Sequence, residues 1–155
     1  MNKIRTTACL AVALLLCSAA IADPFDDDPT GAQRDIDYAN GKKAIDAKDW
    51  MTAIKRLGSA ALRDTKNADI QNYLGYAYRN AGNMELAFKH YARALELSPR
   101  HRGAHEYMGE AYLLVDNLQK AEEHLAALQK ICLIPCEEYD DLAKKIKAYR
   151  TRADK

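Results

Sequence analysis

Small and apolar residues recur along this chain with a period of 34 residues. Gly41, Gly75 and Gly109 mark the period. The same spacing relates Ala53, Ala87 and Ala121; Leu57, Tyr91 and Leu125; Ala60, Ala94 and Leu128; and Ala44, Tyr78 and Tyr112. A weaker column holds Asn40, Leu74 and Met108. Because five columns agree across three copies, we expect three consecutive structural repeats.

Within one copy, the apolar positions form two stripes with the period of an α-helix. The first stripe holds Leu74, Gly75 and Tyr78, and the second holds Ala87, Tyr91 and Ala94. The dipeptide Gly82-Asn83 separates them and is typical of a turn. Pro99 ends the second stripe, because the residue before a proline is disfavoured in the α region. Each copy is therefore predicted to be a helical hairpin.

Applied to the whole chain, this pattern predicts seven helices. Their expected ranges are 34–47, 50–63, 68–81, 84–97, 102–115, 118–131 and 137–152. The last one carries Tyr139, Leu142, Ile146 and Tyr149 on one side and basic residues elsewhere. An amphipathic helix of this kind suits the exposed end of a repeat array. Contact with anionic lipid is the alternative for a basic amphipathic helix.

The repeat resembles the tetratricopeptide repeat (TPR) family. Leu74-Gly75-x-x-Tyr78, followed by Ala87, Tyr91, Ala94 and Pro99, fits the family motif at its spacing. The resemblance covers 34–135, as copies 34–67, 68–101 and 102–135, and the first copy departs from the motif at Asn40 and Ala44. It implies an all-α fold, a right-handed α-solenoid of three TPR helical hairpins with a capping helix over 136–155.

The N-terminal segment has the features of a secretory signal peptide. Lys3 and Arg5 precede an apolar run that ends in Ala20-Ile21-Ala22, a small-x-small cleavage pattern. The run is about 15 residues long, shorter than the roughly 20 that span a membrane. We therefore predict a signal peptide over 1–22, followed by an acidic, disordered leader over 23–33. The mature protein is expected in the periplasm or outside the cell. An uncleaved anchor and lipidation of Cys17 are the alternatives.

Charge and motif content limit the classes of function. Cleavage after Ala22 removes Lys3 and Arg5 but no acid, so the formal net charge falls by two, from +1 to −1. A nearly neutral chain has no overall attraction to nucleic acid. We find no G-x-S-x-G, phosphate loop or H-E-x-x-H motif. The sequence thus predicts a binding protein without catalytic residues or cofactors, whose partner is a protein or peptide, with no stable membrane insertion after cleavage.

Cys132 and Cys136 are the two cysteines that remain after cleavage. An even pair in an oxidising compartment favours a disulfide, and Pro135 lets the chain fold back between them. The alternatives are thiol exchange or a Cu(I) site, for which His124 is a candidate third ligand. His101 and His105 have a spacing that can chelate a metal on a helix, but no carboxylate completes a convincing motif. We predict no metal site.

The family resemblance also implies where a partner binds, because the first helix of each hairpin lines the concave side of the solenoid. One stripe of these three helices is predicted to contact the partner. It holds Tyr38, Lys42, Ile45, Asn72, Tyr76, Arg79, Glu106, Glu110 and Leu113. The stripe changes from basic to acidic along the array and contains Tyr and Arg, which often anchor interfaces. The alternative is an ordinary solvated face.

Overall fold

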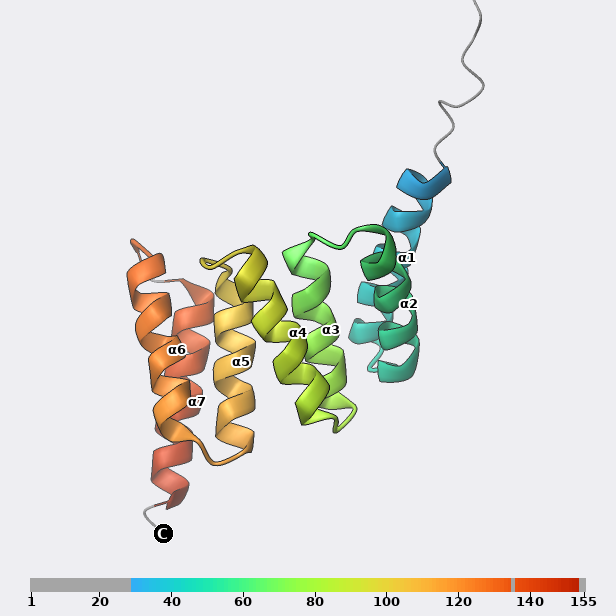
Figure 1. The fold of residues 1–155 in the computed structure, drawn as a ribbon. Coiled ribbons are helices and arrows are strands. Elements are labelled where there is room, and N and C mark those ends of the chain that lie inside the picture. Colours follow the sequence, from blue (N-terminus) through green and yellow to red (C-terminus); the bar gives the residue numbers. More distant parts are fainter. Residues whose placement is uncertain (1–28, 135, 154–155) are drawn as a thin grey trace, which may run out of the picture.

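The computed structural model describes residues 29–134 and 136–153, with side chains given for 36–134 and 136–152. Over these residues the fold consists of seven helices and no strands. They are α1 (Pro29–Asp46), α2 (Trp50–Arg63), α3 (Ala68–Asn80), α4 (Met84–Leu97), α5 (Arg102–Leu114), α6 (Leu118–Ile131) and α7 (Glu137–Ala153). Consecutive helices pair as hairpins that stack side by side (Figure 1). The predicted all-α solenoid of three hairpins plus a final helix is confirmed.

The first helix begins earlier than the sequence pattern predicts. α1 begins at Pro29, whereas we expected a helix from residue 34 and a disordered leader over 23–33. The prediction of disorder is therefore wrong for residues 29–33. A proline fits the first helical turn, where its missing N–H would have no intrahelical partner. Residues 1–28, including the predicted signal peptide and the rest of the leader, lie outside the described residues.

The turns inside the hairpins repeat with the same period as the core. Lys48, Gly82 and Asp116 all adopt left-handed backbone conformations, with φ of 57°, 83° and 55°. The next residue in each copy caps the second helix: Asp49, Asn83 and Asn117 accept hydrogen bonds from the amides of Thr52, Leu86 and Lys120. Such caps satisfy amides that the helix leaves free. The same local turn and cap therefore set the connection between the two helices in each of the three hairpins.

Glycine allows the two helices of a hairpin to touch. A Cβ atom at Gly75 would lie 2.5 Å from Cδ1 of Tyr91, which is fully buried in α4. At Gly41 the Cβ would lie 2.6 Å from Cγ of Leu57 in α2. Both distances are far below van der Waals contact, so only glycine permits this packing. At these two positions the repeated glycine lets the paired helices approach closely.

The last helix, α7, covers the end of the array that α5 and α6 leave open. Its Leu142 and Ile146 are buried with Leu113 and Leu128 in one apolar cluster. Leu142 also occupies the space above Gly109, where a Cβ would lie 2.6 Å from Leu142 Cδ2. The apolar stripe of α7 is thus used inside the protein. None of the helices in the described part of the chain is long and apolar enough to cross a membrane.

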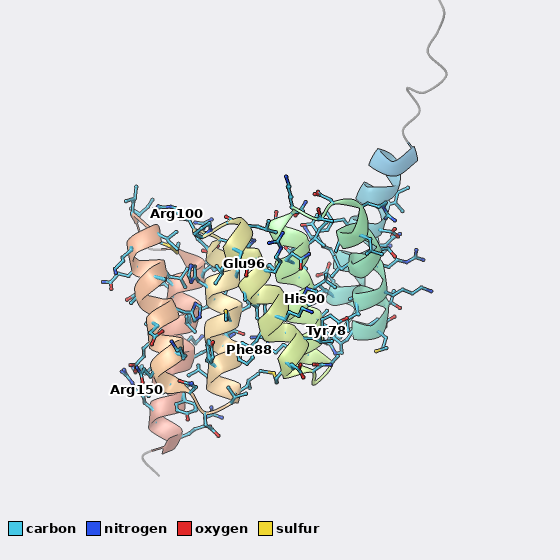
Figure 2. All side chains as sticks on the ribbon, in the orientation of Figure 1. Tyr78, Phe88, His90, Glu96, Arg100 and Arg150 are labelled. Carbon is cyan, nitrogen blue, oxygen red and sulfur yellow. A yellow bond between two sulfur atoms is a disulfide. The ribbon has the colours of Figure 1, made fainter. Side chains whose placement is uncertain are left out.

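Aromatic side chains fill the space between neighbouring helices. Figure 2 shows Tyr78 and His90, which stack between α3 and α4 with ring centroids 5.2 Å apart. Phe88 of α4 contacts Tyr112 of α5, with ring centroids 4.6 Å apart. The first contact joins the two helices of one hairpin, and the second joins that hairpin to the next. The solenoid is therefore held by contacts between neighbours, as expected for a repeat array.

Candidate functional site

Four of the tyrosines on the helices α1, α3 and α5 lie in pairs that join neighbouring hairpins. We call Tyr38, Tyr73, Tyr76 and Tyr107 the tyrosine row. The ring centroids of Tyr38 and Tyr73 are 6.0 Å apart, and those of Tyr76 and Tyr107 are 4.8 Å apart. All four side chains are half-buried. The row thus presents large aromatic surface that is partly accessible and held by neighbouring helices.

Two cations lie between the rings of this row. Lys42 Nζ is 5.5 Å from the centroids of both Tyr38 and Tyr73. The guanidinium carbon of Arg79 is 5.0 Å from the Tyr76 centroid and 5.6 Å from that of Tyr107. A cation in this position is attracted by the negative face of the ring. Each cation therefore links tyrosines from two successive first helices.

Arg79 also takes part in a buried charge network. Its Nη1 donates to Glu110 Oε2 at 2.6 Å and to the carbonyl of Tyr107 at 3.2 Å. The side chains of Arg79 and Glu110 are both less than 10% exposed. Glu110 pairs in addition with Lys145 of α7. Because these charges offset one another inside the protein, neither Arg79 nor Glu110 presents a free charge to a partner.

The nine residues predicted to contact a partner fall into three groups. Tyr38, Ile45 and Tyr76 are half-buried, and Lys42 is exposed. Arg79, Glu110 and Leu113 are committed to contacts with other helices, Leu113 in the apolar cluster beneath α7. Asn72 and Glu106 are buried but line an open pocket. The structure thus brings together only part of the predicted stripe as a surface for a partner.

This pocket, which we call the acidic pocket, has a volume of about 530 Å³. It is formed by the first two turns of α3, α5 and α7, together with Ser98 and His101. Its carboxylates are Asp69, Glu106, Glu137, Glu138 and Asp141, and Tyr73 and Tyr107 form the wall that it shares with the tyrosine row. Arg102 is the one Lys or Arg side chain in the described lining, and it pairs with Glu138 at 3.3 Å.

Glu106 is the buried carboxylate of this pocket, and its pKa is raised. Burial is the main cause, and the negative charge of Glu110 adds to it, so the pKa of Glu106 is raised to about 7. Lys145 opposes the shift, while Asp141 and Glu138 reinforce it. Desolvation of a carboxylate without a close cation favours its neutral form. Glu106 is therefore partly protonated near neutral pH.

The histidines are engaged in contacts that hold helices together. His101 caps α5, because its Nδ1 accepts from the amide of Ala104, and its Nε2 donates to Asp69 at 3.0 Å. His105 and His124 contact each other through their Nδ1 atoms at 3.0 Å. Burial lowers the pKa of His124 to about 4, with His105 adding to the shift. His101 and His105 therefore face different partners rather than a shared metal position.

Cys132 and Cys136 are joined as a disulfide, with Cα atoms 6.0 Å apart. The loop between them exposes Leu133 and Ile134 to solvent. His124 faces His105 and Tyr112 rather than these sulfurs. Over the described residues, no group of three or more His, Cys, Asp or Glu side chains is placed to hold a metal ion.

Comparison with known proteins identifies one hairpin of this architecture as a known repeat. Residues 68–101, which are α3, α4 and the segment up to α5, match the model described as tetratricopeptide repeat. This hairpin is a tetratricopeptide repeat. A relative, the protein O-mannosyl-transferase TMTC3 of Homo sapiens, is 29% identical over 93 residues. Those residues are 59% of this chain but only 10% of TMTC3, so the match concerns a small part of that relative.

Solved structures share the fold of this protein. The type III secretion translocator chaperone SycD of Yersinia enterocolitica superposes with a TM-score of 0.71 at 16% identity, covering 81% of this chain and 88% of SycD. PcrH, in complex with the chaperone binding region of PopD, superposes with a TM-score of 0.70 at 18% identity, covering 79% and 95% of the two chains. At these identities the likeness is one of fold.

Sequence reasoning missed Tyr73, Tyr107 and the acidic first turn of α7 as parts of the site. Tyr73 and Tyr107 follow Asn72 and Glu106 directly and are separated by 34 residues, the repeat period. That spacing was a usable signal, since it places the two rings on equivalent turns of α3 and α5. The contribution of α7 had no such signal, because the helix lies outside the three repeats and reaches the pocket through tertiary packing.

Proposed function

We propose that this protein is an exported TPR adaptor that holds a segment of a partner protein against α1, α3 and α5. The tyrosine row is the observation that carries the proposal. Half-buried Tyr rings from the first helices of three successive hairpins offer apolar area that is already ordered, so little side-chain entropy is lost on binding. Tyr and Arg side chains are also the commonest anchors of protein interfaces.

The geometry divides the proposed binding face into parts with different roles. Tyr38 and Tyr76 supply contact area, and the exposed Lys42 attracts an acidic part of the partner. Arg79 orients Tyr76 and Tyr107 and is itself neutralised by Glu110. Exposed charges mainly affect the rate of encounter, whereas buried aromatic contacts determine dissociation. We therefore expect the tyrosines to dominate affinity.

The structural relatives support a protein or peptide as the class of partner. PcrH is seen with the chaperone binding region of PopD, a protein segment. The TPR domain of Spaghetti (RPAP3) is seen with the HSP90 peptide SRMEEVD. A shared fold does not transfer a particular partner, since sites differ between proteins with one fold. We carry over only the class, and with it a binding role rather than an enzymatic one.

Photo-crosslinking in cell-envelope material tests this proposal. A photoreactive phenylalanine analogue replaces Tyr76 in one variant and the exposed Lys89 of α4 in a matched control. We expect the same partner to be captured repeatedly from position 76 and not from position 89. With that partner purified, Tyr76→Ala should weaken binding by about 1–3 kcal/mol, mainly through faster dissociation. Capture from position 89 alone, together with unchanged binding by Tyr76→Ala, would refute the assignment of this face.

Export is a separate part of the proposal. The charged start, the apolar run and Ala20-Ile21-Ala22 favour removal of residues 1–22. The intact mass of the protein from the cell envelope should correspond to a chain that begins at Asp23. A mass that retains residues 1–22, or one that includes a lipid on Cys17, would contradict it.

A further inference from the structure

The acidic pocket contains buried polar groups that have no partner. Asn72 is 4% exposed, and its Oδ1 accepts no hydrogen bond in the described part of the protein. Glu106 is 9% exposed, and among the described residues no donor lies within hydrogen-bonding or ion-pairing distance of its carboxylate. A buried acceptor without a donor destabilises the folded protein, because the hydrogen bond that it made to water is not replaced. Both groups line a pocket that is open to solvent, where a ligand can supply the missing donors.

The charges around the pocket favour a cation. His101 accepts from the Ala104 amide through Nδ1 and contacts Asp69 Oδ1 through Nε2 at 3.0 Å. The guanidinium of Arg102 is paired with Glu138. Glu106, Glu137 and Asp141 therefore have no cation within ion-pairing distance among the described residues. A positively charged group entering the pocket would meet an excess of carboxylates.

The same helix ends do not make an anion site. The free amides at the starts of α3 and α5 are capped by Asn67 and His101. The first turn of α7 carries Glu137 and Glu138, which offset the positive end of its dipole. A bare metal ion is also a poor fit, because the carboxylates do not converge as a ligand set and the pocket is far larger than an ion. The chemistry suits a bulky organic cation.

We propose that the acidic pocket binds one Arg or Lys side chain of the partner, with Glu106 as its charge partner, Asn72 as a hydrogen-bond acceptor, and Tyr73 and Tyr107 beside the alkyl chain. This inference rests on the proposed function, because the pocket shares Tyr73 and Tyr107 with the tyrosine row. It adds a specificity element: a partner segment needs a basic residue placed to enter the pocket while the segment lies on the row. Tyr faces next to a cation add further attraction.

Protonation gives the site a recognisable pH dependence. The guanidinium or ammonium binds the ionised form of Glu106, so binding must release the proton that the raised pKa holds in the free protein. The groups that set this balance are Glu110 on α5 and Glu138, Asp141 and Lys145 on α7. Affinity should therefore rise as the pH increases from 6 to 8, and the rise should disappear when Glu106 cannot ionise.

A titration with single amino-acid probes tests the pocket without knowledge of the partner. The probes are Nα-acetyl-arginine methylamide, its lysine counterpart, and the citrulline counterpart, which has a similar shape but no charge. Two-dimensional NMR of the mature protein follows the Asn72 side-chain amide and the Gly103 and Tyr107 backbone amides. We expect saturable shifts with the arginine or lysine probe and none with citrulline. Equal shifts with citrulline would overturn the proposal.

Matched variants complete the test. Glu106→Gln removes the carboxylate charge of Glu106 without changing the size of the side chain, and Glu85→Gln makes the same change at an exposed position of α4. We expect at least a tenfold loss of probe affinity in the first and wild-type affinity in the second; unchanged affinity in Glu106→Gln would refute the site. If the probes fail while Tyr76 still captures a partner, this inference alone is wrong. If the probes bind but Tyr76 captures nothing, the proposed function fails and the pocket stands.

Discussion

At the residue scale, the repeated glycine has a clear physical role. Gly75 lets α3 approach Tyr91, and a methyl group there would overlap the ring. We predict that Gly75→Ala lowers the free energy of unfolding by about 1–3 kcal/mol, because a well-packed core resists added volume. Urea denaturation followed by circular dichroism measures this change.

Gly58 provides the matched control for that substitution. It lies inside α2, and apart from its chain neighbours and the backbone of its own helix, no atom of the described residues lies within 4 Å of the position that its Cβ would occupy. Here alanine only restricts the unfolded chain and favours the helix, so Gly58→Ala should stabilise the protein by about 0.5–1 kcal/mol. If both substitutions changed stability in the same direction, close packing at Gly75 would not be the reason for its glycine.

Glu106 should link stability to pH. Its folded pKa of about 7 lies above the ordinary value, so the folded state holds the proton more tightly than the unfolded state. The resulting contribution to the stability of the folded protein is fully present below the pKa that Glu106 has in the unfolded chain. It is lost as the pH rises through 7. Glu106→Gln should therefore raise stability at pH 8 by about 1–3 kcal/mol relative to wild type, and change it little at pH 4.

Unfolding curves for both proteins at the two pH values measure this difference. Glu85→Gln, at an exposed position, should show no such dependence on pH. A Glu106→Gln variant that is less stable than wild type at pH 8 would mean that the carboxylate has a stabilising partner in the folded protein.

At the scale of elements, the segment between α6 and α7 is closed by the disulfide of Cys132 and Cys136. A closed loop of this length contributes about 2 kcal/mol in the chain-entropy model. The variant with both Cys132→Ser and Cys136→Ser should thus lose no more than about 2 kcal/mol of stability and keep its partner binding. Wild-type protein under reducing conditions is the matched control and should lose the same amount.

Thiol titration of the unreduced mature protein should find no free thiol. If the double variant folds with normal stability but loses its activity in the cell, then the sulfurs have a chemical role that a structural disulfide does not explain. Loss of binding by the double variant alone, with binding kept by reduced wild type, would instead point to the serine substitutions.

At the scale of the whole molecule, stability is distributed between neighbours. α7 packs on α5 and α6 but makes no direct contact with the first hairpin. Leu142 is fully buried in this end cluster. Leu142→Ala should cost about 2–5 kcal/mol, as for other buried leucines. Hydrogen exchange should show lost protection first in α5, α6 and α7, with α1 and α2 less affected.

Lys147→Ala, at an exposed position of the same helix, is the control and should leave exchange nearly unchanged. Equal loss of protection along all seven described helices after Leu142→Ala would show that the array unfolds as one unit rather than from its end.

The sequence by itself determined the repeat, the helix ends and the turns of this protein. Helix ends fell within one residue of prediction for α2 to α7, because hydrophobic period, Asn and Asp caps and turn residues act over a few positions. The start of α1 was missed, since Pro29 can begin a helix as readily as it can precede one.

Only the tertiary structure decided which predicted site residues are accessible. The sequence placed Arg79 and Glu110 on one surface but not in one ion pair, because 31 positions separate them and side-chain reach depends on how the hairpins stack. It also could not place α7. In the structure, Lys145 of this helix pairs with Glu110, and Leu142 fills the space over Gly109. The start of α7 completes the acidic pocket. Local interactions set the elements, while the packing of distant helices set the charges and the space that a partner meets.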